Sequence, residues 1–567
     1  MAGAYQPDGP LIVQADRSLL LEVDNPLYAD CRDSLAAFAE LRKSPEHIHT
    51  YAITPLSLWN ACAAGISVEQ VTGALERYSK YELPGNVLAD VRDLMGRYGK
   101  LRLLSRGGGL TLEVVDPDLM VQVRRNPHIA PLLGGADGSN RAEVAPLHRG
   151  RLKQALMKVG LPVEDLAGYT DGAPFPVTLQ QQDSLGRPFA LRDYQNAAAD
   201  AFWAGGGPRG GSGVLVLPCG AGKTVIGLGV MGRVSRRTLI LCTGITAVRQ
   251  WQRELLDKTG VNPADVGEYS GEKKEIRPIT LATYQVMTTH GRAGKDAFPH
   301  LDLFTQQDWG LIIYDEVHLL PAPVFRITAE IQSRRRLGLT ATLVREDGRE
   351  DDVFSLIGPK RYDVPWKDLE RQGWIAPAVC TEVRVPMQRD LRMEYATAER
   401  RQQHRIAATN PVKLQALKGL LERHPEDRVL VMGTYLDQLE GIAKRLGAPL
   451  VTGKTPNWER ESLYDAFRRG EKRLLVVSRV ANFAIDLPEA NVAIELSGTF
   501  GSRQEEAQRL GRILRPKADQ GQAYFYAVVS RESLDQSYSD HRQLFLTEQG
   551  YRYQIEDFSP DMRPTKS

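Results

Sequence analysis

The sequence is poor in cysteine and contains no long hydrophobic run. Its five cysteines are scattered over 567 residues, and none forms a Cys-x-x-Cys pair with another. This spacing argues against a disulfide scaffold and against a structural zinc site, and it fits a reducing compartment. Because no stretch reaches the roughly 18 apolar residues of a membrane-spanning helix, we expect no transmembrane segment.

The chain also lacks an excess of charge of either sign. It carries 72 basic and 70 acidic residues, for a net charge of +2. This balance excludes a histone-like basic coat, but a local basic groove could still hold nucleic acid. The N-terminus lacks the basic start and apolar run of a signal peptide. We therefore expect a cytoplasmic, nucleoid-associated protein.

What the chain does contain is enough length for several domains, roughly three to five at 100–200 residues each. Residues 1–116 show helical patterns followed by two strand-like runs, 100–105 and 110–115, which are joined by three glycines. Helices followed by a hairpin are the order of a winged helix. Such a module would dock DNA or a partner, or would serve only for packing, and both readings stay open. Residues 117–186 are less regular. The expected helices lie at 24–41, 54–64, 67–78, 84–98 and 150–159.

From Leu191 onward, apolar strands alternate with helical segments in two blocks. Buried strands that alternate with helices indicate parallel sheets covered on both faces, so the fold class is α/β. We expect one such domain over residues 187–365 and a second over 411–567. The charge-rich stretch between them, residues 366–410, is expected to form a small helical insertion.

A phosphate-binding loop is predicted where a strand ending at Leu217 precedes Pro-Cys-Gly220-Ala221-Gly222-Lys223-Thr224. In such a loop, backbone N–H groups and the start of the following helix bind phosphates. Lys223 would reach the β- and γ-phosphates of ATP, and the Thr224 hydroxyl would coordinate Mg²⁺. Leu217 occupies the place of the usual first glycine.

A second motif, Leu311-Ile-Ile-Tyr-Asp315-Glu316-Val-His318, places two carboxylates after four apolar residues. Ligands of open α/β sheets bind at the carboxyl ends of strands. We therefore expect Asp315 to hold Mg²⁺ and Glu316 to orient or activate the attacking water.

A third motif lies in the C-terminal block, where Gln508, Arg512 and Arg515 share one face of an expected helix. Alone they would suit a solvated basic face. Together with the first two motifs they predict catalytic groups that reach the γ-phosphate.

Weaker elements occur in the expected order around these motifs. Arg192 and Gln195 precede the phosphate loop and would read adenine. Thr340 and Thr342 would couple the nucleotide state to domain closure, and Asp486 would approach the ribose or the domain interface.

The ordered set resembles superfamily 2 helicases, and more narrowly the XPB family in its bacterial branch. The distinguishing residues are Arg345-Glu346-Asp347, which match the RED motif of that family. Similar stretches include Leu356-Ile-Gly-Pro-Lys360 and Phe545-Leu-Thr-Glu-Gln-Gly-Tyr551, and the likeness is dense over residues 187–558.

The resemblance implies two RecA-like domains, a thumb-like insertion at 366–410 and a damage-recognition region at 117–186. It further implies ATP- and Mg²⁺-dependent 3′–5′ unwinding or translocation on single-stranded and forked DNA, in nucleotide excision repair or transcription-linked opening. Arg345, Glu346 and Asp347 would act at the fork. Gln250 and Thr283 join the DNA-contact and coupling residues, although residues 243–251 match the family motif mainly at their end.

Three alternatives remain open from the residues: an RNA helicase, a DNA-stimulated clamp or translocase, and a nuclease-linked motor subunit. An RNA helicase would share the backbone contacts, and a DNA-stimulated ATPase that only clamps or translocates on duplex would share every motif. An intrinsic nuclease is not expected, because no Pro-Asp is followed at the proper spacing by an acidic-x-Lys triplet. A separate nuclease partner remains possible.

Overall fold

The computed structural model describes most of the chain, in two compact units. The units comprise residues 1–217 with 222–363, and residues 218–221 with 364–567. No helix within the described residues is both long and apolar enough to cross a membrane. The described ranges are 6–43, 47–106, 109–145, 148–167, 171–207, 210–218, 220–287, 307–319, 333, 335–341, 350–364, 366–478, 490–498, 522–548, 551 and 553–558.

The chain begins with a four-stranded antiparallel sheet in the order β1-β2-β4-β3. The helix expected over residues 24–41 is shorter than predicted, because α1 ends at Leu35 and Leu41 pairs with Tyr51 in the sheet. Tertiary pairing here outweighs the local helical pattern. The elements are β1 (Leu11–Val13), β2 (Ser18–Glu22), α1 (Tyr28–Leu35), β3 (Glu40–Lys43) and β4 (Ile48–Ala52).

Three helices and a hairpin follow, in the predicted order. The second of these helices begins with a capping box, in which Ser67 Oγ accepts from Gln70 N–H and Ser67 N–H donates to Gln70 Oε1. These elements are α2 (Pro55–Ala63), α3 (Val68–Tyr78), α4 (Gly85–Arg97), β5 (Leu101–Arg106) and β6 (Gly109–Val114).

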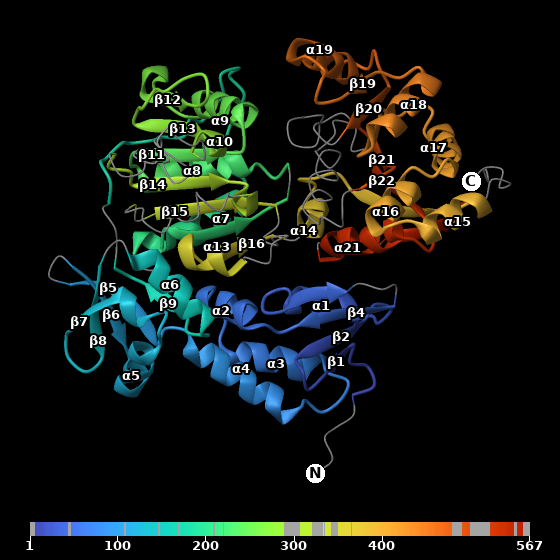
Figure 1. Cartoon of the computed structure of the whole chain (residues 1–567). Helices are drawn as coiled ribbons and strands as arrows, with labels where there is room; N and C mark the ends of the chain where they lie inside the picture. Colours follow the sequence, from blue (N-terminus) through green and yellow to red (C-terminus); the bar gives the residue numbers. More distant parts are fainter. Residues whose placement is uncertain are drawn as a thin grey trace. The chain divides into compact units, whose positions relative to one another are not determined.

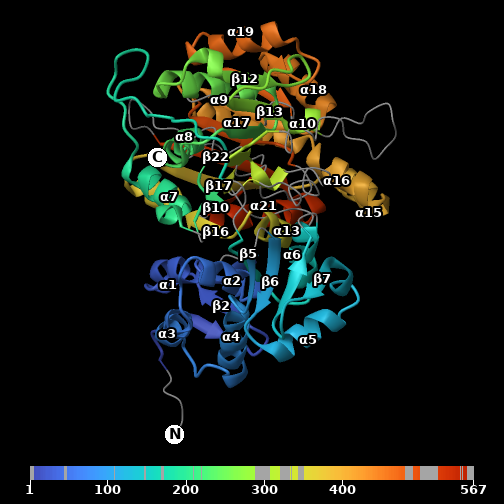
Figure 2. The ribbon, with the colours of Figure 1, turned by 90° about the vertical axis from the view of Figure 1, so that its left-hand side faces the viewer.

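The hairpin is part of a larger sheet, in the order β7-β8-β6-β5-β9. Leu103, Leu112 and Leu152 share one buried cluster, so the boundary expected at residue 116 falls inside a single packed module. In both views α6 of this module lies beside α13 (Figures 1 and 2). Its further elements are α5 (Pro117–Arg125), β7 (Leu133–Ala136), β8 (Arg141–Val144), α6 (Arg149–Lys158) and β9 (Val163–Asp165).

The first expected α/β domain contains a seven-stranded parallel sheet, which confirms the predicted alternation. Its order is β12-β13-β11-β14-β15-β10-β16, and helices cover it (Figure 1). The strands are β10 (Ser212–Val216), β11 (Thr238–Cys242), β12 (Val266–Tyr269), β13 (Ile279–Thr283), β14 (Leu311–Asp315), β15 (Arg335–Thr340) and β16 (Lys360–Asp363). The helices are α7 (Asp193–Trp203), α8 (Lys223–Val234), α9 (Ile245–Lys258), α10 (Tyr284–Met287) and α13 (Glu350–Leu356).

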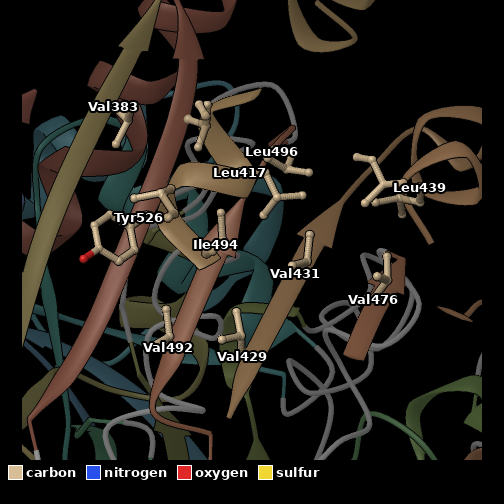
Figure 3. Close-up of a cluster of buried hydrophobic side chains, with 14 of the residues drawn as sticks. Val383, Leu417, Val429, Val431, Leu439, Val476, Val492, Ile494, Leu496 and Tyr526 are labelled. Carbon is tan, nitrogen blue, oxygen red and sulfur yellow. The ribbon is translucent and has the colours of Figure 1, made fainter. Parts of the chain in front are cut away.

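The second α/β domain contains another seven-stranded parallel sheet, ordered β19-β20-β18-β21-β22-β17-β23. Side chains of neighbouring strands, including Val431 and Ile494, pack with Leu417 and Leu439 (Figure 3). The strands are β17 (Ala378–Val385), β18 (Val429–Gly433), β19 (Leu450–Val451), β20 (Leu474–Ser478), β21 (Val492–Glu495), β22 (Ala523–Ser530) and β23 (Tyr553–Asp557). The helices are α14 (Trp366–Arg371), α15 (Arg389–Thr397), α16 (Arg400–Ala408), α17 (Val412–Arg423), α18 (Leu436–Leu446), α19 (Asn457–Arg468) and α21 (Leu534–Glu548).

The stretch 366–410 differs from the expected helical insertion, because β17 lies inside the second sheet and pairs with β22 and β23. This strand could not be predicted from its pattern, because it contains charged residues. Glu382 is fully buried there, and it accepts hydrogen bonds from Ser539 Oγ at 3.0 Å and Arg384 Nε at 2.7 Å. The helical part of the stretch is the pair α15 and α16.

Candidate functional site

The phosphate loop and the acidic motif lie at the same edge of the first parallel sheet. The loop follows β10, Asp315 ends β14 and Glu316 follows it, and β15 lies between these strands. Leu217 is fully buried, and its N–H donates to Thr340 O at 2.9 Å. Leucine at the first-glycine position therefore extends the strand pairing by one residue before the loop turns.

The loop has the backbone conformation of an anion cradle. Gly220 and Gly222 have φ angles of 84° and 77°, a region that favours glycine. Gly222 is the N-cap of α8, whose N-terminal N–H groups can meet phosphate oxygens. Lys223 and Thr224 are the first two residues of this helix, and buried Ala221 precedes them. These residues fit the phosphates of a nucleoside triphosphate.

Gln195, in the first turn of α7, lies beside this loop. A Cβ on Gly222 would lie 2.6 Å from Gln195 Nε2, so the glutamine side chain occupies the space beside the loop. Gln195 is buried, and its Oε1 accepts from the Arg192 backbone N–H at 3.0 Å. The structure thus brings Gln195 to the phosphate loop, with Arg192 bonded to it. Recognition of adenine by the two residues stays a prediction.

Lys223 and Glu316 form the ion pair of the site. Lys223 Nζ lies 2.8 Å from Glu316 Oε1, and the two side chains are 11% and 18% exposed. Burial alone would raise the pKa of Glu316, but the charges of Lys223 and His318, together with hydrogen bonds from Lys223 and the Ala341 backbone, outweigh it and lower the pKa. Glu316 also has a left-handed backbone with a φ of 49°, a conformation that costs about 1–3 kcal/mol and is typical of functional sites.

Asp315 lies next to this pair and is half-buried. Burial and the adjacent Glu316 carboxylate raise the pKa of Asp315 to about 6. Two half-buried carboxylates therefore lie close to Lys223, and a divalent cation would supply further positive charge that favours the ionised form of Asp315. This electrostatic deficit fits Mg²⁺, for which Asp315 and Thr224 are the expected ligands.

The acidic motif also contacts β15 through His318. His318 Nδ1 and Thr340 Oγ1 are 2.6 Å apart, and both residues are buried. The hydroxyl expected to couple the nucleotide state to domain movement is therefore bonded to the acidic motif. His318 carries no assigned role in the sequence-based site.

Two further DNA-contact and coupling candidates, Gln250 and Thr283, have different surroundings. Gln250 is exposed on α9. Thr283 is buried at the end of β13, where its hydroxyl accepts from Val286 N–H at 3.3 Å. Thr283 is thus placed to hold the chain after β13, and DNA contact by either residue stays a prediction.

Two residues that the sequence-based site omits bind Asp315 directly. Trp251 Nε1 donates to Asp315 Oδ2 at 3.0 Å, and Tyr284 OH donates to Asp315 O at 2.9 Å. Each immediately follows a coupling candidate, Gln250 or Thr283. That adjacency is the signal by which they could have been found.

The remaining candidates lie outside the described residues, and their roles stay predictions. They belong to the RED motif, the helix expected in the C-terminal block, and two single positions. They are Arg345, Glu346, Asp347, Thr342, Asp486, Gln508, Arg512 and Arg515.

Three family models match the chain. Residues 369–565 match the ERCC3/RAD25/XPB C-terminal helicase, and residues 188–345 match the Type III restriction enzyme, res subunit. Residues 11–136 match a helicase conserved C-terminal domain, although they lie near the N-terminus of this chain.

Curated relatives match over nearly the whole length. The DNA 3′-5′ helicase XPB of Mycobacterium tuberculosis is 58% identical, over 97% of this chain and 98% of the relative. That of Kineococcus radiotolerans is 56% identical, over 97% of each. The general transcription and DNA repair factor IIH helicase/translocase subunit XPB of Antonospora locustae is 34% identical, over 96% of this chain and 81% of the relative. With such identity over nearly all of its length, the chain belongs to the XPB family of superfamily 2 helicases.

Proposed function

We propose that this chain is an ATP-dependent DNA helicase or translocase of 3′–5′ polarity that opens duplex DNA in nucleotide excision repair. The observation that carries the proposal is the ion pair of Lys223 with Glu316, beside Asp315 and a glycine loop at the carboxyl edge of a parallel sheet. Relatives that match 97% of the chain are named DNA 3′-5′ helicases.

Each of these residues has a separate task in hydrolysis. Asp315 and Thr224 would hold Mg²⁺, and the bound metal would offset the negative charge that develops on the phosphates. The α8 N-terminus and Lys223 would bind the phosphates. Glu316 orients the attacking water. If phosphate drew Lys223 away, Glu316 would lose the charge that lowers its pKa most, so the effect of burial would count for more and the carboxylate would become a stronger base.

Residues of the C-terminal domain and the RED motif would carry out the second half of the cycle. Gln508, Arg512 and Arg515 would stabilise the transferring phosphate, and Asp486 would contact the ribose. Arg345, Glu346 and Asp347 would act at the fork. The protein would contact DNA mainly through its phosphates, so its affinity for DNA should decrease steeply as the salt concentration rises.

ATP hydrolysis tests the proposal, measured with no nucleic acid, single-stranded DNA, forked DNA and RNA. Stimulation by DNA that disappears in Glu316→Gln is the expected result. Stimulation by RNA alone would contradict the choice of DNA.

Strand displacement from duplexes with a 3′ or a 5′ tail then tests unwinding and its polarity. Displacement only from the 3′-tailed duplex is expected. DNA-stimulated hydrolysis without displacement from either would favour a clamp or a duplex translocase. Association with the nucleoid and a nuclease partner belong to the proposal as well, and fluorescence microscopy and co-purification test them.

A further inference from the structure

We infer that Trp251 and Tyr284 are positioning residues. They hold Asp315 in place and thereby couple DNA binding on the first α/β domain to the affinity of the Mg²⁺–nucleotide site. The inference rests on the proposed function and adds a physical link between its two halves. Neither residue is expected to touch ATP or DNA; each would act through Asp315.

The first link runs through α9. Gln250 is exposed on this helix, whereas Trp251, the next residue, is 1% exposed. Val248, Trp251 and Leu255 form the buried face of α9. A movement of α9 that follows contact at its exposed face must therefore carry the indole with it.

The indole is held tightly at the site end. Its Nε1–H donates to Asp315 Oδ2 at 3.0 Å. Its ring packs on Gly227 of α8, where an added Cβ would lie 2.4 Å from the Trp251 ring. Interiors are close-packed, so the ring has no room to shift independently of both helices. Trp251 thus connects α9, the phosphate-binding helix and the expected metal ligand.

The second link runs through the end of β13. Tyr284 follows Thr283, is 4% exposed, and donates its hydroxyl hydrogen to the Asp315 carbonyl oxygen at 2.9 Å. The carboxylate and the backbone of Asp315 are therefore restrained by two different segments. Each of these segments also holds a DNA-coupling candidate.

Hydrogen-bonded partners of a metal-binding carboxylate set its orientation, and losing one typically lowers metal affinity or activity about 10–100-fold. Coupling between two ligands is also reciprocal, so DNA must change nucleotide affinity by the factor with which nucleotide changes DNA affinity. Both consequences can be measured without turnover.

The experiment compares Trp251→Phe and Tyr284→Phe with the wild-type full chain. Fluorescent mant-ADP is titrated over a range of Mg²⁺ concentrations, with and without an oligothymidylate. Tyr284→Phe removes only one oxygen, so it keeps the test valid if Trp251→Phe folds poorly. Leu255→Ala is the matched control, because it removes packing from the same face of α9 without touching Asp315.

Both aromatic variants should need about 10-fold more Mg²⁺ for half-maximal nucleotide binding. The effect of DNA on nucleotide affinity should fall to a factor near one. Leu255→Ala should keep the wild-type Mg²⁺ requirement and DNA effect. Wild-type behaviour in both aromatic variants, or an equal loss in Leu255→Ala, overturns the inference and leaves the proposed function intact. A wild-type chain that neither binds DNA nor responds to it overturns the proposed function, and the inference with it.

Discussion

Lys223 Nζ lies 2.8 Å from Glu316 Oε1, while Glu316 keeps a left-handed backbone with a φ of 49°. The strained residue and the phosphate-loop lysine therefore form one ion pair at the carboxyl edge of the sheet. In the proposed function the γ-phosphate of ATP would replace the carboxylate at the lysine.

Glu316→Gln should lower the rate of ATP hydrolysis by about 10²–10⁴-fold, the usual contribution of a general base. Nucleotide binding should persist, because the amide oxygen can still face Lys223. Initial-rate hydrolysis assays and mant-ADP titration check the two parts. Glu426→Gln is the control, since that side chain is 92% exposed and should keep the wild-type rate.

Gly222→Ala should weaken nucleotide binding roughly 10-fold or more, because a Cβ in the left-handed region costs about 1–2 kcal/mol. The new methyl group would also displace Gln195, whose Nε2 would lie 2.6 Å away. Gly419→Ala is the matched control, since its Cβ meets no atom within 4 Å and it lies inside α17. That control should gain about 0.5–1 kcal/mol in free energy of unfolding. Unchanged mant-ADP affinity in Gly222→Ala would contradict the assignment of this loop as a phosphate-binding site.

Asp165→Asn should lower the free energy of unfolding of the first unit by about 3–5 kcal/mol, because it removes the negative charge that offsets two buried cations. Asp165 Oδ2 accepts from Arg149 Nε and Lys153 Nζ, each at 3.0 Å, and all three side chains are nearly buried. Asp93→Asn breaks the exposed pair with Arg97 and should cost at most about 1 kcal/mol. Urea unfolding measures both variants, and equal losses would refute the prediction.

The same cluster predicts a pH dependence. Burial would raise the pKa of Asp165, but Lys153 and Arg149 outweigh it and hold the pKa well below the ordinary value. The cluster therefore stabilises the fold above the unfolded pKa of about 3.9, and this stability is lost as pH falls through the folded value. Urea unfolding from pH 6 down to about pH 3 should show a shallower decline in Asp165→Asn than in wild type. Parallel curves would contradict the assignment.

Thr340→Val should separate hydrolysis from unwinding. It removes the hydroxyl 2.6 Å from His318 Nδ1, and the loss of a buried partner costs about 1–3 kcal/mol. We expect DNA-stimulated hydrolysis to persist while fewer base pairs open per ATP. Parallel hydrolysis and strand-displacement assays give that ratio, and Thr340→Ser should restore it. A wild-type ratio in Thr340→Val would rule out a coupling role for this bond.

The strands and the site motifs could be predicted because their signals are local. Leu311–Asp315 is apolar up to its final carboxylate, and Gly222-Lys223-Thr224 lies between a strand and a helix. β17 could not be predicted in this way, since charged residues such as Glu382 and Arg384 are typical of an exposed segment. Only the tertiary structure brings Ser539 of α21 to Glu382, where it donates a hydrogen bond to the buried carboxylate. The end of the helix expected over residues 24–41 could not be predicted either, because it depends on the pairing of Leu41 with Tyr51 in the sheet.

By itself, the sequence determined the chemistry: the phosphate loop, the paired carboxylates and the alternation that makes parallel sheets. Those features depend on residues that are close along the chain, so spacing and periodicity reveal them. Only the tertiary structure decided which groups surround Asp315. Trp251 lies 64 positions before it and Tyr284 lies 31 positions before it, yet both bind it. Strand order brings them together, because β11 pairs with both β13 and β14, and strand order is set by packing of the whole sheet.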